Sequence, residues 1–346
     1  MVPQYADNRK PARPISKHTI TESYTFDDLL LVPRYSDIES RKDVSLHTAI
    51  LGVSIPIVSA NMKSVTEYEM AKAMEKLNGL AILHRFMTIE KNIDIFKECN
   101  PHYTGCSVGV KNEDYERVSR LVRENCDIIC VDIAHGDSLL ARQMISYIKN
   151  NYPEVFIIAG NVCTGRAAVE LAEHGAHVIK VGIGPGSLCS TRIKTGNGVP
   201  QMSALMDVYY AREDSGLNFG IIADGGIRNS GDIVKALCFS DMVMLGSLLA
   251  GTEEAASLPI EKNGKKYKIY QGSSTYKNEN VEGVVGLVPS TGPVAKVIDE
   301  LLQGVRSGLS YQGVRSIKEL HEIDKHFVKI TNAGLAESHP HDIGSL

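Results

Sequence analysis

Short apolar segments alternate with longer amphipathic segments along most of this 346-residue chain. The apolar segments are continuous and rich in β-branched residues, which is typical of strands that are buried on both faces. Eight of them follow one another along the chain: Ile55–Ala60, Leu80–His84, Cys106–Val110, Ile128–Ile133, Val155–Gly160, Val178–Ile183, Gly220–Ala223 and Met242–Leu245. The pattern therefore predicts a series of eight buried strands.

Between these segments, apolar residues recur at helical spacing, as in Glu113–Asn125, Ser138–Asn150 and Gly165–His174. Residues typical of helix ends predict starts near Asp114, Ser138 and Asp232 and a stop at Gly175. Eight strand–helix units in series favour an α/β fold, a single closed (β/α)8 barrel. An open doubly wound sheet is the alternative, although few glycine-rich dinucleotide-binding signals follow the first strand.

The segments outside this repeat suggest a simple domain organisation. Residues 1–21 are polar and contain three prolines, so we expect a flexible or surface-wrapping arm before a barrel domain that spans residues 22–346. Apolar helical spacing resumes in Pro293–Ser307, which is the expected last barrel helix, whereas Phe327–Leu346 has little pattern. No inserted regulatory domain is expected.

Residues 251–291 follow the eighth strand and are mostly polar. Within them, Glu261–Tyr270 predicts a hairpin that turns at Asn263-Gly264, because this dipeptide suits a tight two-residue turn. The next stretch, Gln271–Gly286, is a polar loop long enough to act as a lid over the end of the barrel.

Composition and charge narrow the classes of function. The net charge of −4 gives no general attraction to nucleic acid, and no apolar run approaches the roughly 20 residues that cross a membrane. The first 21 residues lack the apolar core of a secretory signal. Seven cysteines without disulfide or CxxC spacing indicate a reducing compartment, so we expect a cytoplasmic protein.

The loop after the sixth strand, Gly182–Gln201, is rich in glycine and proline and is expected not to form a helix. Active groups of such barrels lie on the loops at the carboxyl ends of the strands. Cys189 lies in the middle of this loop with Arg192 nearby, and a thiol beside a guanidinium is readily poised as a nucleophilic thiolate. A buried packing role is the alternative reading, which we favour for most of the other cysteines. Loop carbonyls from Gly184, Gly186 and Cys189 are also candidate ligands for a monovalent cation.

Glycines follow the seventh and eighth strands, where barrels often bind phosphate. Gly225 and Gly226 follow Asp224, and Ser247 follows Gly246. Backbone amides approach a phosphate closely at glycine, while Asp224 is better suited to a ribose diol. Two tight strand–helix turns are the alternative reading of each motif, but their occurrence at both expected strand ends favours a phosphate site.

Further polar groups are expected at the same end of the barrel. Asp132 and His135 follow the fourth strand, and Asn161 and Thr164 follow the fifth, so they suit a second polar ligand such as a nicotinamide ribose. His135 is equally compatible with a loop histidine without chemistry, and His84 is expected to be a packing histidine. Met62 is a candidate for the wall of a base pocket. Glu282 becomes a candidate proton-relay partner of Thr191 if the lid folds over Cys189.

Four segments, GIGPGSLCSTR, IADGGIRNSGDI, MLGSLLAGTEE and AGLAESHPHD, resemble the IMP dehydrogenase/GMP reductase family, and the resemblance runs from about Thr25 to the C-terminus. It implies a homotetrameric barrel that binds a purine nucleotide. In this family a cysteine attacks C2 of the base, and a nicotinamide cofactor exchanges hydride with that carbon.

Carried over position by position, the resemblance implies roles for the residues that match. Cys189 is the implied nucleophile, with Thr191 and Glu282 as the proton relay. The implied nucleotide-binding residues are Met62, Asp224, Gly225, Gly226, Gly246, Ser247, Gly272, Ser273, Ser274 and Gly283. The implied cofactor-binding residues are Asp132, Ile133, Ala134, Ile183, Gly184 and Ser273, with Ser40, Arg41, Ser310 and Tyr311 reaching across a subunit boundary. For a 2′-phosphate the basic candidates are Arg41, Lys63, Arg85 and Lys277, and the sequence alone places none of them. The implied ligands of a potassium ion are Gly184, Gly186, Cys189 and Arg192. Ser273, Lys63 and Asn197 depart from the residues usual in the family.

Two reactions share this site in the family, and the lid separates them. IMP dehydrogenases use an Arg-Tyr pair on a mobile flap to activate water, whereas the nine residues between Gly272 and Glu282 here, SSTYKNENV, contain no arginine. Segments such as HRF and NVEG look like a bacterial GMP reductase branch, which implies NADPH as the cofactor. The alternatives are oxidation of IMP to XMP with NAD, which GVPQ and the ESHPHD tail favour, and a nucleotide-binding regulator without turnover.

Overall fold

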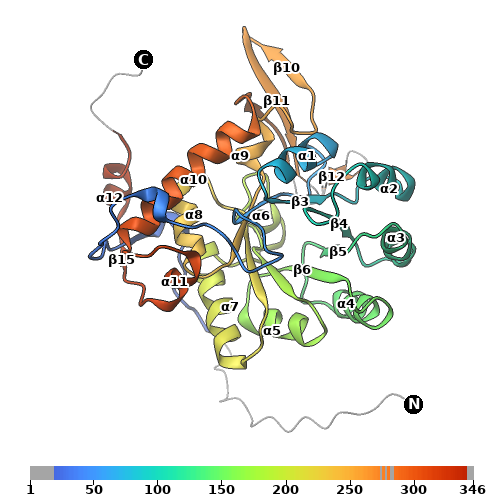
Figure 1. Ribbon diagram of the computed structural model, residues 1–346, viewed down its shortest axis with the longest axis horizontal. Helices are drawn as coiled ribbons and strands as arrows, with labels where there is room; N and C mark the ends of the chain where they lie inside the picture. The colour runs from blue at the N-terminus through green and yellow to red at the C-terminus, as the bar shows by residue number, and fades with distance from the viewer. Residues whose placement is uncertain (1–18, 273–274, 277–278, 281–283, 341–346) are drawn as a thin grey trace.

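Eight parallel strands close into a barrel at the centre of the protein (Figure 1), which confirms the predicted α/β barrel. The computed structural model describes residues 19–272, 275–276, 279–280 and 284–340. Each barrel strand pairs with the next, and the barrel closes between β2 and β9, where Ile57 pairs with Val243. The barrel strands are β2 (Ile57–Ser59), β3 (Leu80–Leu83), β4 (Thr104–Val108), β5 (Ile128–Asp132), β6 (Phe156–Val162), β7 (Val178–Val181), β8 (Gly220–Asp224) and β9 (Met242–Leu245). All eight lie within or across the predicted segments.

Helices surround the barrel and connect successive strands (Figure 1). They are α1 (Tyr68–Lys76), α2 (Ile89–Lys97), α3 (Asn112–Arg123), α4 (Leu139–Asn151), α5 (Gly165–Glu173), α6 (Thr191–Thr195), α7 (Gln201–Ser215), α8 (Ser230–Leu237), α9 (Ser247–Ala250), α10 (Val294–Tyr311), α11 (Ile317–Glu322) and α12 (Asn332–Glu337). No helix of the described part of the chain is long and apolar enough to cross a membrane.

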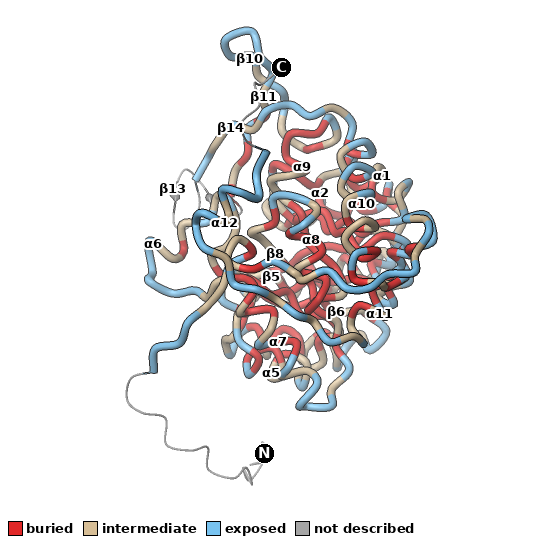
Figure 2. Tube along the Cα trace, turned by 90° about the vertical axis from the view of Figure 1, so that its left-hand side faces the viewer, coloured by how far each residue is buried: buried red, intermediate tan, exposed pale blue. Residues whose placement is uncertain are grey.

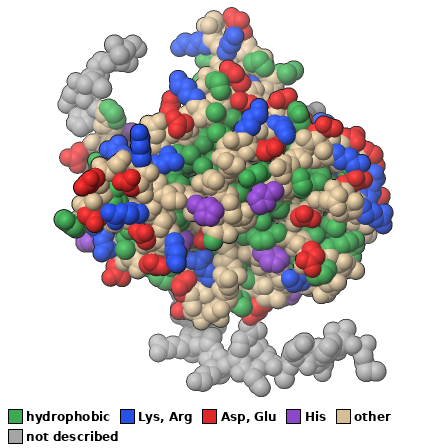
Figure 3. All heavy atoms as spheres, in the orientation of Figure 1, with side chains coloured by type: hydrophobic (Ala, Val, Ile, Leu, Met, Phe, Trp, Pro, Cys, Tyr) green, Lys and Arg blue, Asp and Glu red, His purple; other side chains and the backbone are tan. Residues whose placement is uncertain are grey.

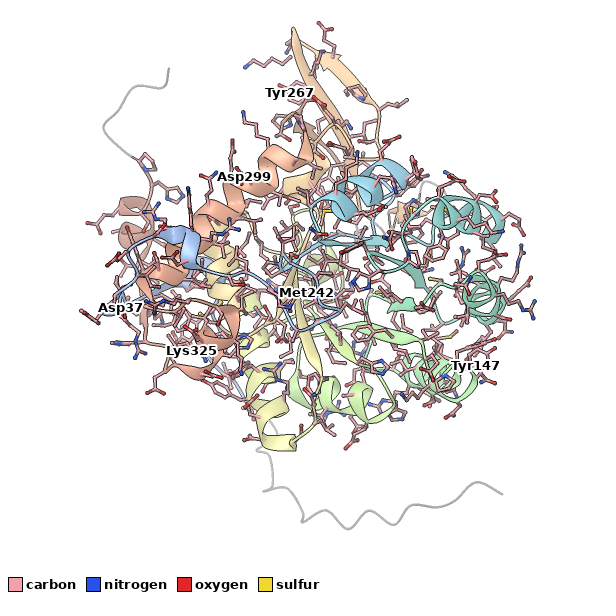
Figure 4. The ribbon with its side chains drawn as sticks, viewed as in Figure 1. Asp37, Tyr147, Met242, Tyr267, Asp299 and Lys325 are labelled. Carbon is pink, nitrogen blue, oxygen red and sulfur yellow. The ribbon has the colours of Figure 1, made fainter. Side chains whose placement is uncertain are left out.

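The barrel strands are apolar on both faces because they separate two layers of core. In β5, Ile128 and Cys130 pack with the barrel interior, whereas Ile129 and Val131 pack in the layer between strands and helices. Figure 2 shows this buried centre surrounded by exposed loops, and Met242 lies at the centre of the barrel in Figure 4. The side-chain period of two therefore explains why continuous apolar runs, rather than alternating ones, marked the strands.

The helix ends agree with the sequence in part. Ser138 is the N-cap of α4 as predicted, and its hydroxyl accepts a hydrogen bond from the amide of Ala141. The helices predicted to start near Asp114 and Asp232 begin two residues earlier, and both aspartates occupy the third helical position after the N-caps Lys111 and Asn229. Asp114 accepts a hydrogen bond from the amide of the N-cap residue, so the acidic residue marks the first turn rather than the boundary.

A hairpin projects from one side of the barrel beyond α9 (Figure 1). Its strands β10 (Pro259–Lys262) and β11 (Lys265–Gln271) turn at Asn263 and Gly264, both with positive φ, as predicted. The expectation of a loop through Gly286 was wrong, because β14 (Val285–Pro289) pairs with β11 as a third strand. Short strands β12 (Thr275–Tyr276) and β13 (Glu279–Asn280) pair with each other between β11 and β14.

Two other segments are more regular than the sequence indicated. The loop after β7 contains the short helix α6, although its glycines and prolines predicted none; the intervening Thr191–Thr195 contains neither. The C-terminal segment forms β15 (Phe327–Lys329) and α12, and β15 pairs antiparallel with β1 (Leu29–Leu31). Two short 3-10 helices, Phe26–Asp28 and Arg41–Asp43, complete the N-terminal part of the described chain.

Candidate active site

A cavity of about 860 Å³ opens at the carboxyl ends of the barrel strands. Residues at the carboxyl ends of all eight strands or in the loops that follow them line it, with Asn161 near the end of β6 as the contribution of that strand. It brings together most of the predicted site residues: Met62, Arg85, Asp132, Ile133, Ala134, Ile183, Gly184, Gly186, Cys189, Thr191, Asp224, Gly225, Gly226, Gly246, Ser247 and Gly272. Its volume lies within the range of small-molecule and cofactor sites.

Cys189 is the exposed cysteine of the seven, and it faces this cavity. Its amide donates to the carbonyl of Gly186 over 3.0 Å, and its thiol donates to the hydroxyl of Thr191 over 3.2 Å. The side chain of Thr191 is buried at the first position of α6. The turn and the helix start therefore hold a thiol and a hydroxyl together at the mouth of the cavity.

Arg192 does not take the place expected for a partner of the thiol. Its guanidinium donates to the carbonyls of Ile183, over 3.3 Å, and Val199, over 2.5 Å, and so ties the two ends of the loop together. Gly184 lies directly against this side chain, since a Cβ there would come within 2.5 Å of it. Arg192 thus stabilises this conformation of the loop.

The predicted potassium ligands share this loop. The Gly186 carbonyl accepts from the amide of Cys189, and the Arg192 carbonyl accepts from the amide of Gly196 over 3.1 Å. Each carbonyl oxygen keeps a second lone pair, but the Arg192 guanidinium already supplies a positive charge beside Gly184. The carbonyls of Gly186 and Arg192 would thus be among the ligands of a potassium ion on this loop.

The loops after β8 and β9 present glycine backbone to the cavity. Gly225 and Gly226 have φ of +94° and +82°, so the turn uses conformations that L side chains rarely adopt. Gly246 lies at the other loop, next to Ser247 at the start of α9. Together they give the backbone access that the sequence predicted for a phosphate.

Tyr270 is a residue of this site that sequence reasoning missed. It is buried on β11, and a Cβ at Gly246 would lie 2.6 Å from its hydroxyl oxygen. Burial raises the pKa of Tyr270 to about 12, so the hydroxyl keeps its proton and remains a donor. The hairpin pattern placed it at the end of a strand, but the sequence held no signal of its burial, because β11 buries Lys268 and Tyr270 and leaves the apolar Ile269 between them exposed.

Lys180 is the second missed residue, and it lies among three predicted ones. Its ammonium is 2.9 Å from Asp132 and 2.7 Å from Asp224, and it also donates to the side-chain carbonyl of Asn161. The Asn161 amide in turn donates to Asp224 over 2.9 Å. One carboxylate oxygen of Asp224 therefore contacts the ammonium of Lys180 in the barrel. The Asp224 side chain is 22% exposed, and it lines the cavity.

Comparisons with known proteins agree with this geometry. The family model described as IMP dehydrogenase / GMP reductase domain matches residues 23–341. The chain belongs to the IMP dehydrogenase/GMP reductase family. It is therefore placed among oxidoreductases of purine nucleotide interconversion, which use a nicotinamide cofactor.

Relatives within the family carry both activities. An inosine-5′-monophosphate dehydrogenase of Borreliella burgdorferi is 37% identical over 400 residues, covering 94% of this chain and 98% of that protein. A GMP reductase of Lactobacillus delbrueckii subsp. bulgaricus is 38% identical over 324 residues, covering 90% and 96%. The crystal structure of a cysteine-to-alanine variant of GMP reductase from Trypanosoma brucei, in complex with guanosine 5′-monophosphate, matches with a TM-score of 0.88 and 29% identity over 94% of this chain and 99% of that one. Similarity alone does not separate the two reactions.

Some residues implied by the family resemblance lie away from the cavity. Ser40 and Arg41 are at an exposed 3-10 helix. Ser310 and Tyr311 end α10, and Tyr311 lines a separate hollow of about 530 Å³. The single chain does not bring these four residues to the cavity, and their role across a subunit boundary stays a prediction.

The family's lid is described only in part. Ser273, Ser274, Lys277, Glu282 and Gly283 lie outside the described residues. The flanking backbone is attached to the cysteine loop, because the amide of Val284 donates to the carbonyl of Leu188, and the amide of Gly272 donates to the carbonyl of Val284, each over 3.2 Å. Gly272 and Val284, which flank this part of the lid, are therefore bonded to each other, and Val284 is bonded to the residue before Cys189.

Three other predicted polar residues have local roles. The Thr164 hydroxyl caps α5, accepting from the amide of Ala167, while His135 is exposed and is not among the residues lining the cavity. His84 is buried, accepts from the amide of Phe86 and contacts Glu67 over 3.0 Å, as expected of a packing histidine. Glu67 is the group whose pKa falls in this pair, chiefly through its hydrogen bond with His84.

Proposed function

We propose that this protein is an NADPH-dependent GMP reductase, which converts GMP, NADPH and two protons into IMP, ammonium and NADP⁺. The observation that carries the proposal is the lid: nine residues lie between Gly272 and Glu282, and none is an arginine. A dehydrogenase needs an activated water to hydrolyse its covalent intermediate. A reductase needs none, because its intermediate accepts hydride.

The backbone at the loops after β8 and β9 supports binding of the 5′-phosphate of the nucleotide. Gly225, Gly226 and Gly246 give close approach to backbone amides, and the protonated hydroxyl of Tyr270 adds a donor beside Gly246. Asp224 is the proposed partner of the ribose diol. With the phosphate and ribose held there, the purine extends over the floor of the cavity toward Cys189, with Met62, Gly272, Ser273, Ser274 and Gly283 as the proposed base contacts.

The pair of Cys189 and Thr191 supports a covalent route. The Cys189 thiolate adds to C2 of GMP, and the amino group leaves as ammonia after it is protonated through Thr191 and Glu282. C2 then receives hydride, and the thiolate is expelled to give IMP. Dividing one difficult displacement into two easier steps is the advantage of covalent catalysis.

The other side of the cavity fits a nicotinamide cofactor. The carboxylate of Asp132 is 15% exposed at the wall, beside Ile133 and Ala134, and the Nε of Arg85 is buried without a partner among the described residues. An acidic acceptor suits a ribose, and a guanidinium with an unpaired Nε suits a phosphate. NADPH, when bound, supplies the hydride. A potassium ion on the cysteine loop and a homotetramer are further proposals that rest on the family resemblance.

IMP dehydrogenase is the second candidate, because the Borreliella burgdorferi enzyme is 37% identical to this chain and the Lactobacillus GMP reductase 38%, and the segments GVPQ and ESHPHD resemble the dehydrogenase. The initial rate decides between the two directions. We expect the absorbance of the reduced cofactor to fall with GMP plus NADPH and to stay constant with IMP plus NAD. A rise with IMP plus NAD would reverse the assignment, and no change in either mixture, with nucleotide still raising the melting temperature, would indicate a regulator without turnover.

A further inference from the structure

The least exposed ionic group at the cavity is the ammonium of Lys180. Its side chain is 2% exposed and it lies on β7 between apolar neighbours. A lysine in such a position loses its hydration, which is costly unless charge and hydrogen bonds replace the water. Here two carboxylates and the carbonyl of Asn161 replace it.

The fold leaves room for this cluster. Asp132, Lys180 and Asp224 come from β5, β7 and β8, and β6 lies between the first two. On β6, Gly160 pairs with both Asp132 and Lys180, and a Cβ there would lie 2.7 Å from the Cβ of Lys180. The missing side chain at Gly160 therefore lets the lysine lie across β6 and reach both carboxylates.

The two carboxylates serve different sides of the cavity. Asp132 adjoins Ile133 and Ala134 on the proposed cofactor side, and Asp224 precedes the glycines of the proposed phosphate loop. The ammonium lies between them at 2.9 and 2.7 Å, so each carboxylate oxygen is oriented by the same group. With two negative charges and one positive, the cluster retains one net negative charge for donors on the ligands.

We propose that Lys180 is a positioning residue shared by both ligands, which keeps Asp132 ionised and oriented toward the cofactor and Asp224 oriented toward the nucleotide ribose. This inference rests on the proposed function for the assignment of the two sides. It goes further in predicting that one side chain, buried beneath both ligands, controls the affinity for each.

The charges around Asp132 determine how pH acts on it. Burial by itself would raise the pKa of Asp132, but the ammonium of Lys180, by charge and hydrogen bond, lowers it below its ordinary value, with smaller help from Arg85 and Asn61. Cys130 on the same strand is neutral, because burial raises its pKa, and Asp224 faces the same ammonium from β8. Without Lys180, burial and the second carboxylate would act together to protonate Asp132 as the pH falls.

The test replaces Lys180→Met and measures ligand affinity by calorimetry between pH 5.5 and 8.5. IMP is the nucleotide probe because it is product of one family reaction and substrate of the other; NADPH and NAD are the cofactor probes. We expect Lys180→Met to weaken both IMP and cofactor about tenfold or more, Asp224→Asn to weaken mainly IMP, and Asp132→Asn to weaken mainly the cofactor. In Lys180→Met, cofactor affinity falls further as pH is lowered through the neutral range, whereas the wild type stays level there.

Two further variants separate positioning from folding. Lys180→Met/Asp132→Asn restores the net charge of the cluster and abolishes the pH dependence of the single variant. Lys268→Met removes another buried lysine, which donates to the carbonyls of Glu253 and Ala255 away from the cavity, and leaves both affinities and their pH dependence unchanged. The proposal is overturned if Lys180→Met binds both ligands normally, or binds weakly with a level pH profile that Asp132→Asn does not alter. Because none of these readings needs turnover, a failed reductase assay leaves the test intact.

Discussion

The thiol of Cys189 donates to the hydroxyl of Thr191 over 3.2 Å, at the point where the loop after β7 enters α6. The two side chains are held together by local backbone geometry, with the Cys189 amide bonded to the Gly186 carbonyl. The proposed nucleophile and the proposed proton carrier thus lie side by side in the protein without a ligand. Several predictions about chemistry depend on this pair.

Removing the thiol should abolish turnover and leave nucleotide binding largely unchanged. We expect Cys189→Ala to abolish measurable activity and to retain nucleotide affinity within a few fold, because the proposed phosphate and ribose contacts lie on other loops. Cys163→Ala is the matched control, since Cys163 follows β6 and is not among the residues lining the cavity. Residual wild-type turnover in Cys189→Ala would exclude the covalent route.

Removing the Thr191 hydroxyl should slow proton transfer more than it alters binding. We expect Thr191→Val to lower kcat by roughly 10²- to 10³-fold, the usual contribution of a positioned acid–base group, and Thr191→Ser to retain most of it. Steady-state kinetics with GMP separate kcat from KM. If valine and serine lower kcat equally, the hydroxyl has no part in the proton relay.

The Tyr270 hydroxyl should contribute to nucleotide affinity. We expect Tyr270→Phe to raise the KM for nucleotide by about 10- to 100-fold, the loss of a hydrogen bond to a charged group. Because the folded-state pKa is about 12, the hydroxyl stays protonated, and the wild-type KM should show no tyrosine ionisation below about pH 10. Tyr267→Phe, on the projecting hairpin of Figure 4, is the control and should change nothing. Equal KM values for the two variants would remove Tyr270 from the site.

Close backbone approach at Gly182 should make it intolerant of a side chain. A Cβ there would lie 2.0 Å from the carbonyl oxygen of Asp224, whereas one at Gly264 meets nothing within 4 Å, and both glycines have positive φ. In each alanine variant, backbone strain lowers the unfolding free energy by about 1 kcal/mol. In Gly182→Ala, overpacking lowers it by about 1–3 kcal/mol more. Chemical denaturation compares their unfolding free energies, and equal losses would show that the loop relaxes around the clash.

The barrel could be predicted from sequence because its strands separate two apolar layers. That arrangement leaves uninterrupted apolar runs such as Ile128–Val131, and the loops that follow the strands contain most of the proposed site residues. Acidic and basic side chains are interspersed on the face seen in Figure 3. Pairings between distant segments were not predictable from the sequence. For example, β1 and β15 each contain only three residues, and each is a strand only because it pairs with the other.

Lys180 and Tyr270 were missed for a related reason. The residues near Lys180 in the buried segment Val178–Ile183 do not indicate its partners, because these lie on other strands, β5, β6 and β8. Tyr270 occupies the end of a hairpin strand, and its hydroxyl reaches the cavity only because β11 folds back over Gly246. Residues whose role depends on such three-dimensional neighbours need the structure.

The most direct test of the central claim follows the hydrogen that reaches C2. GMP is incubated with the protein and with NADPH carrying deuterium at the transferable position of the nicotinamide, and the nucleotide product is analysed by mass spectrometry while released ammonia is assayed. The account predicts IMP with one deuterium at C2, one ammonia for each IMP, and neither product with Cys189→Ala. Unlabelled IMP, or formation of XMP from IMP and NAD by the same sample, would contradict it.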